Sequence, residues 1–204
     1  MSELIALTED ERDCYQEITN VAMGQAADQL ARLLDVYVVL PIPNVNIIER
    51  NEFKMTIKSL EDAPSVSAVC QGFIGAGVAG EALLIFNDSS FSDISQLLKY
   101  SQELNTEEEL EMLMDVANVL NGACIQGIGK QLDINFSQSH PIILGQHRPI
   151  SELLDEKHVT WQRTMAIEIN YTIEDHNINC DLLLLFTEES VLHMNRLISF
   201  LLED

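Results

Sequence analysis

Two short stripes of acidic and amide side chains are the residues of this chain best suited to chemistry. The first stripe consists of Asp13, Glu17, Asn20 and Gly24. The second consists of Glu111, Asp115, Asn118 and Gly122. In both stripes successive members are 4, 3 and 4 residues apart. At about 100° per residue, each set falls within roughly 60° of arc on one face of a helix.

The asparagine and the glycine make these stripes unusual for a helix face that only meets solvent. Both residue types are poor helix formers, and glycine costs about 1 kcal/mol relative to alanine. A solvated face would more readily use Glu, Lys or Gln. Repeating Asn-x-x-x-Gly in register indicates that something approaches the backbone there. We expect the opposite side of the first helix to face the core through Tyr15, Ile18, Ala22, Ala26 and Leu33.

The chemistry open to these stripes is limited. Neither an acid nor an amide on an open helix is a strong nucleophile. An amide can orient a water molecule by donating and accepting hydrogen bonds, as glutamine does in GTPases. A carboxylate three residues earlier can engage a cation on a partner. The pair therefore suits a protein that completes the active site of another protein.

An internal duplication places both stripes on equivalent helices. Thr8-Glu9-Asp10-Glu11 and Thr106-Glu107-Glu108-Glu109 each predict a capping box that opens a helix. Between Thr8 and Asp35, eight residues are identical to the residue 98 positions later. The repeat continues at an offset of 100, where Asp181–Phe186 matches Glu81–Phe86. We expect one domain over residues 1–204, made of pseudo-symmetric halves at about 1–102 and 103–204.

Strand patterns fill the segments between the helices. Shorter helices are expected from about Ser89 to Tyr100 and from about Glu188 to Leu202. Pro41 and Pro43 suggest a sheet edge, and residues 174–177 suggest a hairpin turn. Long strands joined by short turns indicate an antiparallel sheet shared by both halves, in the α+β class. The expected strands are Val36–Leu40, Val45–Arg50, Ser65–Phe73, Gly77–Phe86, Ile134–Phe136, Pro141–Leu144, Val159–Tyr171 and Asn177–Phe186.

Composition excludes several classes of partner. The chain has 204 residues, 47% of them hydrophobic, so a sizeable core is expected. Its net charge of −22 argues against binding to nucleic acid or to an anionic membrane surface. No apolar run reaches the roughly 18 residues of a membrane span, and the first residues lack the basic start of a signal peptide. The four cysteines show no CxxC spacing and are expected to be buried thiols in a reducing cytoplasm.

Two further patterns have structural explanations. Gly75-Ala76-Gly77-Val78-Ala79-Gly80 fits G-x-G-x-x-G, but a strand pattern follows where a dinucleotide site needs a helix. These glycines therefore predict a tight hairpin. The five histidines lack metal-ligand spacing. We expect no intrinsic metal or nucleotide cofactor.

The doubled stripe resembles the motif of the CheC/CheX/FliY phosphatases of bacterial chemotaxis, which reads D/S-x-x-x-E-x-x-N near the starts of two long helices. Asp13-x-x-x-Glu17-x-x-Asn20 is similar to the first copy, and Glu111-x-x-x-Asp115-x-x-Asn118 to the second. The resemblance spans nearly the whole chain. Two motifs with no appended flagellar-switch domain resemble CheC more than FliY or CheX.

The resemblance implies hydrolysis of the aspartyl phosphate on CheY-like receiver domains. Asn20 and Asn118 would orient the attacking water, and Glu17 and Asp115 would pair with the receiver's active-site lysine. The receiver would supply Mg²⁺ and the phosphorylated aspartate. Asp13, Gly24, Glu111 and Gly122 complete the expected contact surface. The implied fold is an antiparallel sheet packed against two long helices.

One departure from the family pattern concerns the second stripe. It carries Asp115 where the family usually has Glu, so this carboxylate is one methylene shorter. The second site is therefore expected to be the weaker. A non-catalytic module that binds a receiver domain or a CheD-like partner is the alternative function.

Overall fold

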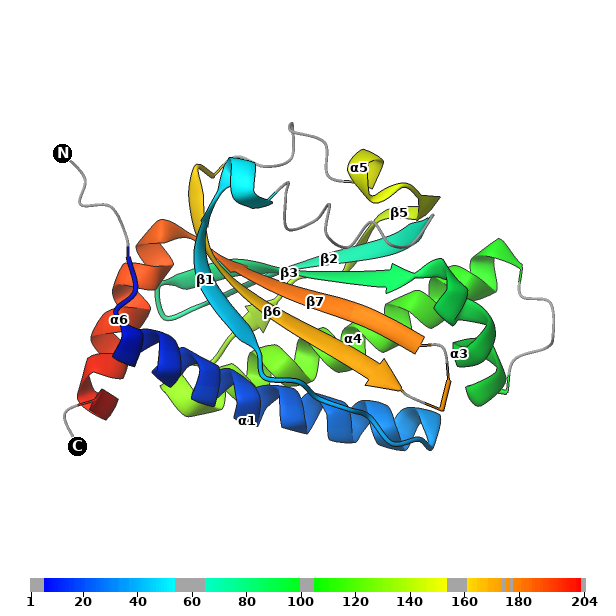
Figure 1. Cartoon of the computed structure of the whole chain (residues 1–204), viewed down its shortest axis with the longest axis horizontal. Helices are drawn as coiled ribbons and strands as arrows, with labels where there is room; N and C mark the ends of the chain where they lie inside the picture. Colours follow the sequence, from blue (N-terminus) through cyan, green and yellow to red (C-terminus); the bar gives the residue numbers. More distant parts are fainter. Residues whose placement is uncertain are drawn as a thin grey trace.

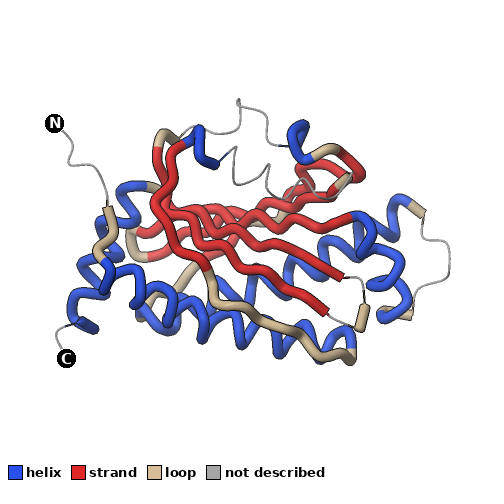
Figure 2. Tube along the Cα trace, viewed as in Figure 1, coloured by secondary structure: helices blue, strands red, loops and turns tan. Residues whose placement is uncertain are grey.

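The computed structural model describes residues 6–53, 65–99, 105–153, 161–173, 175–176 and 178–202. Two long helices, α1 (Glu9–Leu34) and α4 (Thr106–Leu132), run beside one sheet (Figures 1 and 2). Two shorter helices, α3 (Phe91–Leu97) and α6 (Glu188–Leu202), lie near opposite ends of the molecule. The remaining helical turns are η1 (Asp88–Ser90) and α5 (Ile150–Leu153).

In the described part of the chain, seven strands form a single sheet in the order β1-β6-β7-β3-β2-β4, with β5 also paired to β2. All of these pairings are antiparallel. The predicted α+β class with an antiparallel sheet is therefore confirmed. The strands are β1 (Asn44–Glu49), β2 (Val66–Gly75), β3 (Val78–Asn87), β4 (Ser137–Gln138), β5 (Ile142–Arg148), β6 (Arg163–Ile173) and β7 (Ile178–Phe186).

The centre of the sheet joins the two copies of the repeat. β3 pairs with β7, and Leu83 lies opposite Leu183, the residue 100 positions later. On either side, β1 pairs with β6 and β5 pairs with β2, so each half adds an outer strand to the other half's hairpin. Both halves therefore build one sheet, as expected. The boundary between the halves, near residue 102, lies outside the described residues.

The main core lies between the sheet and the layer that contains α1 and α4 (Figure 1). Helix α1 contributes Tyr15, Ala22 and Leu30, and α4 contributes Leu120 and Cys124, all at most 1% exposed. A smaller cluster on the opposite face of the sheet includes Phe53, Leu83, Ile150, Leu153 and Leu183. The helix layer leaves the outer faces of α1 and α4 free, and these faces carry the stripes.

Two predicted strands are wrong. In Val36–Leu40 only Val39 forms a β-bridge, to Thr172. Pro41 and Pro43 follow and lack the N–H that a ladder requires. Ile134–Phe136 is also not a strand, because the N–H of Ile134 donates to the oxygen of Gly129 at 2.7 Å and closes the end of α4.

The other predicted strands are present with shifted ends, and the helix predicted from about Glu188 to Leu202 is confirmed with those bounds as α6. The expected edge is confirmed, since β1 follows the two prolines and is the outermost strand of its side. The helix predicted from Ser89 to Tyr100 appears as η1 followed by α3, and Tyr100 lies outside the described residues, as do Val159, Glu174 and Asn177. Among the described residues, no helix combines the length and apolar content needed to cross a lipid bilayer.

Candidate functional site

The start of α1 is fixed by the predicted capping box. The N–H of Glu11 donates to Thr8 Oγ1 at 3.2 Å, and the N–H of Thr8 donates to Glu11 Oε2 at 2.8 Å. Glu9, Asp10 and Glu11 place negative charge in the first turn, where the helix dipole favours it. The box fixes where α1 begins, and the buried residues on the inner face of the helix set the direction of the first stripe.

Helix α4 begins one residue earlier than the repeat predicts. Its N-cap is Asn105, whose Oδ1 accepts the N–H groups of Glu107 and Glu108 at 2.9 and 3.1 Å. Glu108 Oε2 in turn accepts the N–H of Asn105 at 2.9 Å. The prediction of a box from Thr106 to Glu109 is therefore wrong, because Asn is a stronger N-cap than Thr and stands next to it. Glu109 is thereby left free for another contact.

The two helices lie side by side and run in opposite directions (Figure 1). A Cβ atom added at Gly127 would lie 2.7 Å from both the Cα and the Cβ of Ala22, so α4 approaches the α1 backbone closely there. Both helices end in a left-handed aspartate, Asp35 with φ 56° and Asp133 with φ 54°. Because the helices are antiparallel, the stripe near the start of each helix lies beside the end of the other.

The structure places both stripes on the outer faces of these helices. The acids and amides Asp13, Glu17, Asn20, Glu111, Asp115 and Asn118 are exposed, and Gly24 and Gly122 are half-buried. Within the described part of the chain, the side chains of these six exposed residues form no hydrogen bond or ion pair. The fold therefore does not use them, and they are free to meet a partner.

The core-facing side of α1 agrees with the predicted face at four of five positions. Tyr15, Ile18, Ala22 and Ala26 are buried. Leu33 is 39% exposed, and Leu30 and Leu34 are buried instead. The prediction for Leu33 is wrong because the sheet and α4 contact α1 along an arc that this position lies outside.

The stripe glycines differ from the glycine at the helix contact. A Cβ added at Gly24 meets no atom within 4 Å, and one at Gly122 meets only Gln138 Oε1 at 3.9 Å. Neither position needs glycine for internal packing or for a positive φ. Close internal packing therefore does not explain why these two helix interiors carry glycine.

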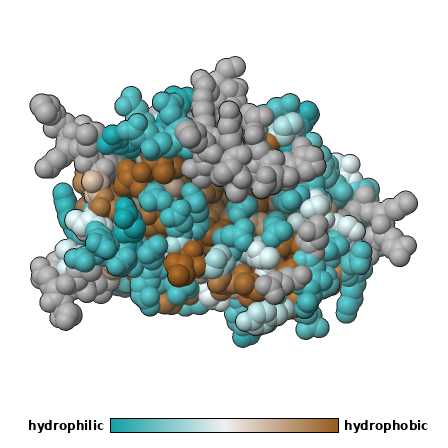
Figure 3. Space-filling view, viewed as in Figure 1, coloured by the Kyte–Doolittle hydropathy of each residue, from teal (hydrophilic) through white to brown (hydrophobic). Residues whose placement is uncertain are grey.

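A groove with a volume of about 790 Å³ lies beside the two acids of the first stripe, Asp13 and Glu17, whereas Asn20 and Gly24 do not line it. Hydrophilic side chains cover much of the surface over the first half of α1, at lower left in Figure 3. Burial raises the pKa of the Cys14 thiol, which keeps it protonated and a poor nucleophile. The groove is lined by Asp10, Asp13, Cys14, Glu17, Ile18, Val21 and Gln131.

Sequence reasoning missed part of this groove. Val21 follows Glu17 by four residues on the same helix and is 38% exposed, so its position could have been found from helical spacing. Gln131 belongs to the last turn of α4. No sequence pattern links it to Glu17, because only the antiparallel packing brings the end of α4 to this place.

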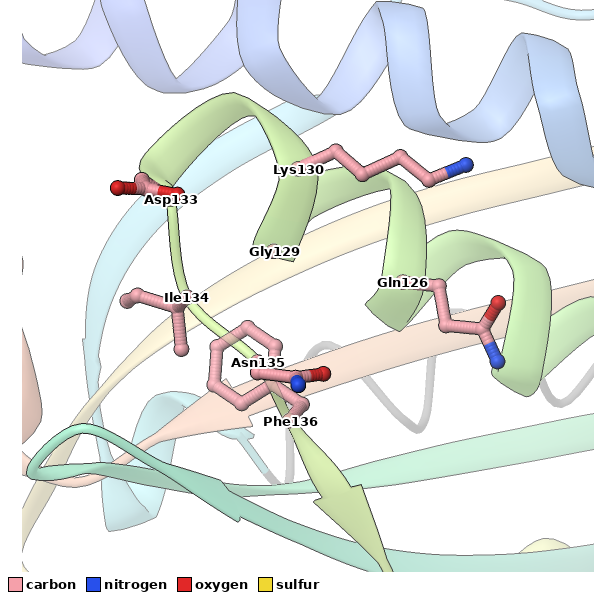
Figure 4. A pocket seen from close by; sticks show the side chains of 7 residues that line it. All are labelled: Gln126, Gly129, Lys130, Asp133, Ile134, Asn135 and Phe136. Atoms are coloured by element: carbon pink, nitrogen blue, oxygen red, sulfur yellow. The ribbon is translucent and has the colours of Figure 1, made fainter.

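A second pocket of about 420 Å³ lies at the end of α4 and holds none of the predicted site residues. Figure 4 shows Asn135 and Phe136 below the last turn of the helix, while Lys130 extends away along it. The lining is completed by Gln126, Gly129, Asp133 and Ile134. The stripes are thus separate from this pocket.

The glycine-rich run forms the predicted hairpin. Gly75 pairs with Val78, and the two residues between them have positive φ, 47° at Ala76 and 81° at Gly77. This two-residue turn joins β2 to β3, whereas a dinucleotide site requires a turn from strand to helix. In the described ranges, no three His, Cys, Asp or Glu side chains gather as metal ligands would.

Comparison with known proteins supports the fold. No protein-family model and no curated protein sequence matches the chain. Among solved structures, FliY from Thermotoga maritima is 19% identical with a TM-score of 0.67, covering 96% of this chain and 98% of FliY. A CheC-like protein from Shewanella oneidensis is 14% identical with a TM-score of 0.55, covering 83% of this chain and 99% of that protein.

A third structure is a complex. CheX from Borrelia burgdorferi, crystallised with CheY, BeF3 and Mg²⁺, is 15% identical with a TM-score of 0.54 and covers 85% of this chain and 98% of that chain. These likenesses show that the chain has the fold of the CheC/CheX/FliY proteins, as the motif predicted. They do not single out CheC, since FliY, CheX and CheC-like structures all match.

Proposed function

We propose that this protein is a phosphatase that accelerates hydrolysis of the aspartyl phosphate on CheY-like receiver domains. The observation that carries the proposal is the duplicated stripe of exposed, unpartnered acid and asparagine side chains, each followed by a glycine that internal packing does not require. The shared fold with a CheX that was crystallised with CheY supports a receiver as the partner. A cytoplasmic location is part of the proposal.

The proposed chemistry uses the two side chains of each stripe for different tasks. The carboxamide of Asn20 or Asn118 donates one hydrogen bond and accepts another, so it can hold a water molecule in line with the phosphorus. The carboxylate of Glu17 or Asp115 pairs with a lysine of the receiver and fixes the docked geometry. The receiver contributes the phosphorylated aspartate and Mg²⁺, so this chain needs no metal of its own.

A non-catalytic module that binds a receiver or a CheD-like partner is the second candidate. It is favoured by another likeness, to FliM from H. pylori in a complex with SpeE, at 13% identity and a TM-score of 0.61. A binding module would control signalling by occupying its partner. It would not release more than one equivalent of phosphate per chain.

The deciding experiment measures phosphate release from a panel of phosphorylated receivers with this protein at about one twentieth of the receiver concentration. An enzyme releases many equivalents of phosphate per chain at a rate above that of the receiver alone. Binding without acceleration on every receiver would refute the enzyme and support the module. The protein without receiver provides the background rate.

The stripe glycines give a test with opposite effects on stability and activity. Changing Gly24 and Gly122 to alanine should raise the free energy of unfolding by about 1–2 kcal/mol, because alanine is the better helix former and the sites have room. The added methyl groups should separate the helices from the partner and lower kcat/KM by roughly three- to tenfold. Thermal unfolding and phosphate release measure the two effects.

The matched control is Gln25→Ala, which places alanine at an exposed position next to the stripe. It should leave kcat/KM unchanged. A more stable glycine variant with full activity would show that no partner approaches the backbone at these positions.

A further inference from the structure

His147, at the end of β5, lies between two carboxylates. Its Nδ1 is 3.0 Å from Asp88 Oδ2, and its Nε2 is 3.0 Å from Glu109 Oε2. Asp88 belongs to η1, and Glu109 belongs to the first turns of α4. The imidazole therefore links η1, the turn that directly follows β3, to the beginning of α4, the helix that carries the second stripe.

Neighbouring contacts hold this arrangement in place. The backbone N–H of His147 donates to Ser67 Oγ at 3.1 Å, and the Ser67 hydroxyl donates to Asp88 Oδ1 at 2.8 Å. Gln146 Nε2 donates to Glu109 Oε2 at 2.7 Å. The backbone of His147 is left-handed, with φ 52°, which costs energy for most side chains but less for His, Asn and Asp.

Only the doubly protonated ring fits both carboxylates. The Nε2–Glu109 contact has hydrogen-bond geometry, whereas the Nδ1–Asp88 contact is an ion pair by distance and leaves Asp88 Oδ2 without a hydrogen bond. A neutral imidazole has one N–H donor, so its other nitrogen would place a lone pair beside a carboxylate oxygen. Partial burial lowers the pKa of His147, but the hydrogen bonds and negative charges of Glu109 and Asp88 raise it by more, so its pKa lies above the ordinary value. The His147 ring therefore keeps its positive charge to a higher pH than an isolated histidine does.

The other described groups packed around His147 carry no charge that acts on its ring. Helix α3 presents the Phe91 ring, with centroids 5.4 Å apart, and β2 presents the Ser67 hydroxyl. The neighbouring Arg148 pairs with Glu152 at 3.7 Å. Among the described residues, the titratable groups that contact His147 are Asp88 and Glu109.

The first long helix is held differently. Glu11, which corresponds to Glu109 in the repeat, closes the capping box with Thr8. Arg12 Nε donates to the oxygen of Val45 at 3.2 Å, and Gln16 Nε2 donates to the oxygen of Pro43 at 3.0 Å. Neither contact involves a histidine. In α4, the cap shift to Asn105 and Glu108 makes Glu109 available to His147.

We propose that His147 is a positioning residue for the second stripe: its protonated ring clamps the start of α4, and its deprotonation loosens the turn before Glu111. The activity part of this inference rests on the proposed function. The sign follows from the proton balance. The clamp is complete while the ring is charged and is lost as pH rises through the titration of His147 in the folded protein. The first stripe lacks this dependence.

The structural arm of the test needs no receiver. Histidine ring signals followed by NMR should show His147 titrating above the usual range for histidine, and Glu109→Gln should lower its midpoint. Amide hydrogen-exchange protection factors in the first two turns of α4 should fall as pH rises through that midpoint. An unshifted titration, or protection independent of pH, would overturn the clamp even if the protein is a phosphatase.

The activity arm isolates each site with one asparagine variant. In the Asn20→Ala background, kcat/KM should fall by roughly threefold between about pH 6 and pH 9, relative to the Asn118→Ala background with the same receiver. Asparagine tolerates the left-handed backbone at position 147, so His147→Asn should make the ratio of kcat/KM in the two backgrounds independent of pH. Equal profiles in the two backgrounds would contradict the proposal.

Glu109→Gln offers a rescue that a purely structural role would not give. Its amide can donate to the nitrogen that loses its proton, so it should keep second-site activity at the higher pH. His140→Asn, which removes an exposed imidazole just before the start of β5, is the matched control and should retain the parent profile. If neither asparagine background accelerates hydrolysis, the proposed function fails, while the NMR and exchange results still decide the clamp.

Discussion

The double variant Asn20→Ala/Asn118→Ala should accelerate receiver dephosphorylation at least about a hundredfold less than the parent protein. Removing one preorganised hydrogen-bonding group from a hydrolytic site typically costs 10²–10³-fold or so in kcat. In the proposed mechanism these two amides are the groups that this chain directs at the attacking water. Phosphate release under limiting protein measures the loss.

This variant should be at least as stable as the parent protein, because alanine is a better helix former than asparagine. Both asparagines are exposed, and neither side chain forms a hydrogen bond within the described residues. Surface changes of this kind usually stay within about 0.5 kcal/mol. Gln25→Ala removes an exposed amide from α1 outside the stripe and should keep full activity. A folded double variant with the parent rate would refute the water-positioning role.

The two sites should be unequal, and Asn20→Ala alone should remove most of the activity. From the same helical position, Asp115 reaches about 1.5 Å less far than Glu17, roughly one carbon–carbon bond. A charge-assisted contact requires a separation of about 2.7–2.9 Å, so it loses much of its strength over that distance. A contact worth about 1.5–3 kcal/mol then costs roughly tenfold or more in kcat/KM.

Single variants measure this difference. Asn118→Ala should retain most of the parent rate, whereas Asp115→Glu in the Asn20→Ala background should increase the remaining rate by restoring the reach of the acid. Asn20, Asp115 and Asn118 are exposed and unpartnered, so these changes should leave the fold intact. If Asn118→Ala proves the more damaging single change, the shorter acid is no handicap and the ranking is wrong.

The sequence by itself determined features that depend on a few neighbouring residues. The Thr8–Glu11 box, the hairpin at Gly75–Val78 and the stripes all follow from local hydrogen bonding, backbone sterics or the helical period. The repeat added the shared antiparallel sheet, because two similar halves that each lack a complete core must combine. The roles of the stripe residues remain predictions.

Predictions from local sequence patterns were wrong where neighbouring residues favoured a different start or end of an element. Val36–Leu40 has strand-forming residues, but the chain is leaving the left-handed Asp35 and is followed by prolines that cannot donate to a ladder. Asn105, and not Thr106, is the N-cap of α4. Both residue types can cap a helix, and the free energies of capping that they provide differ by about one kcal/mol or less.

Only the tertiary structure decided which distant residues meet. The antiparallel contact of Ala22 with Gly127 brings Gln131 to the groove beside Glu17. The same assembly gathers Asp88, Glu109 and His147 from three elements around one imidazole. Such contacts arise from the packing of whole helices and strands, which depends on the volume and shape of the entire buried face. The spacing of residues along one segment carries no information about them.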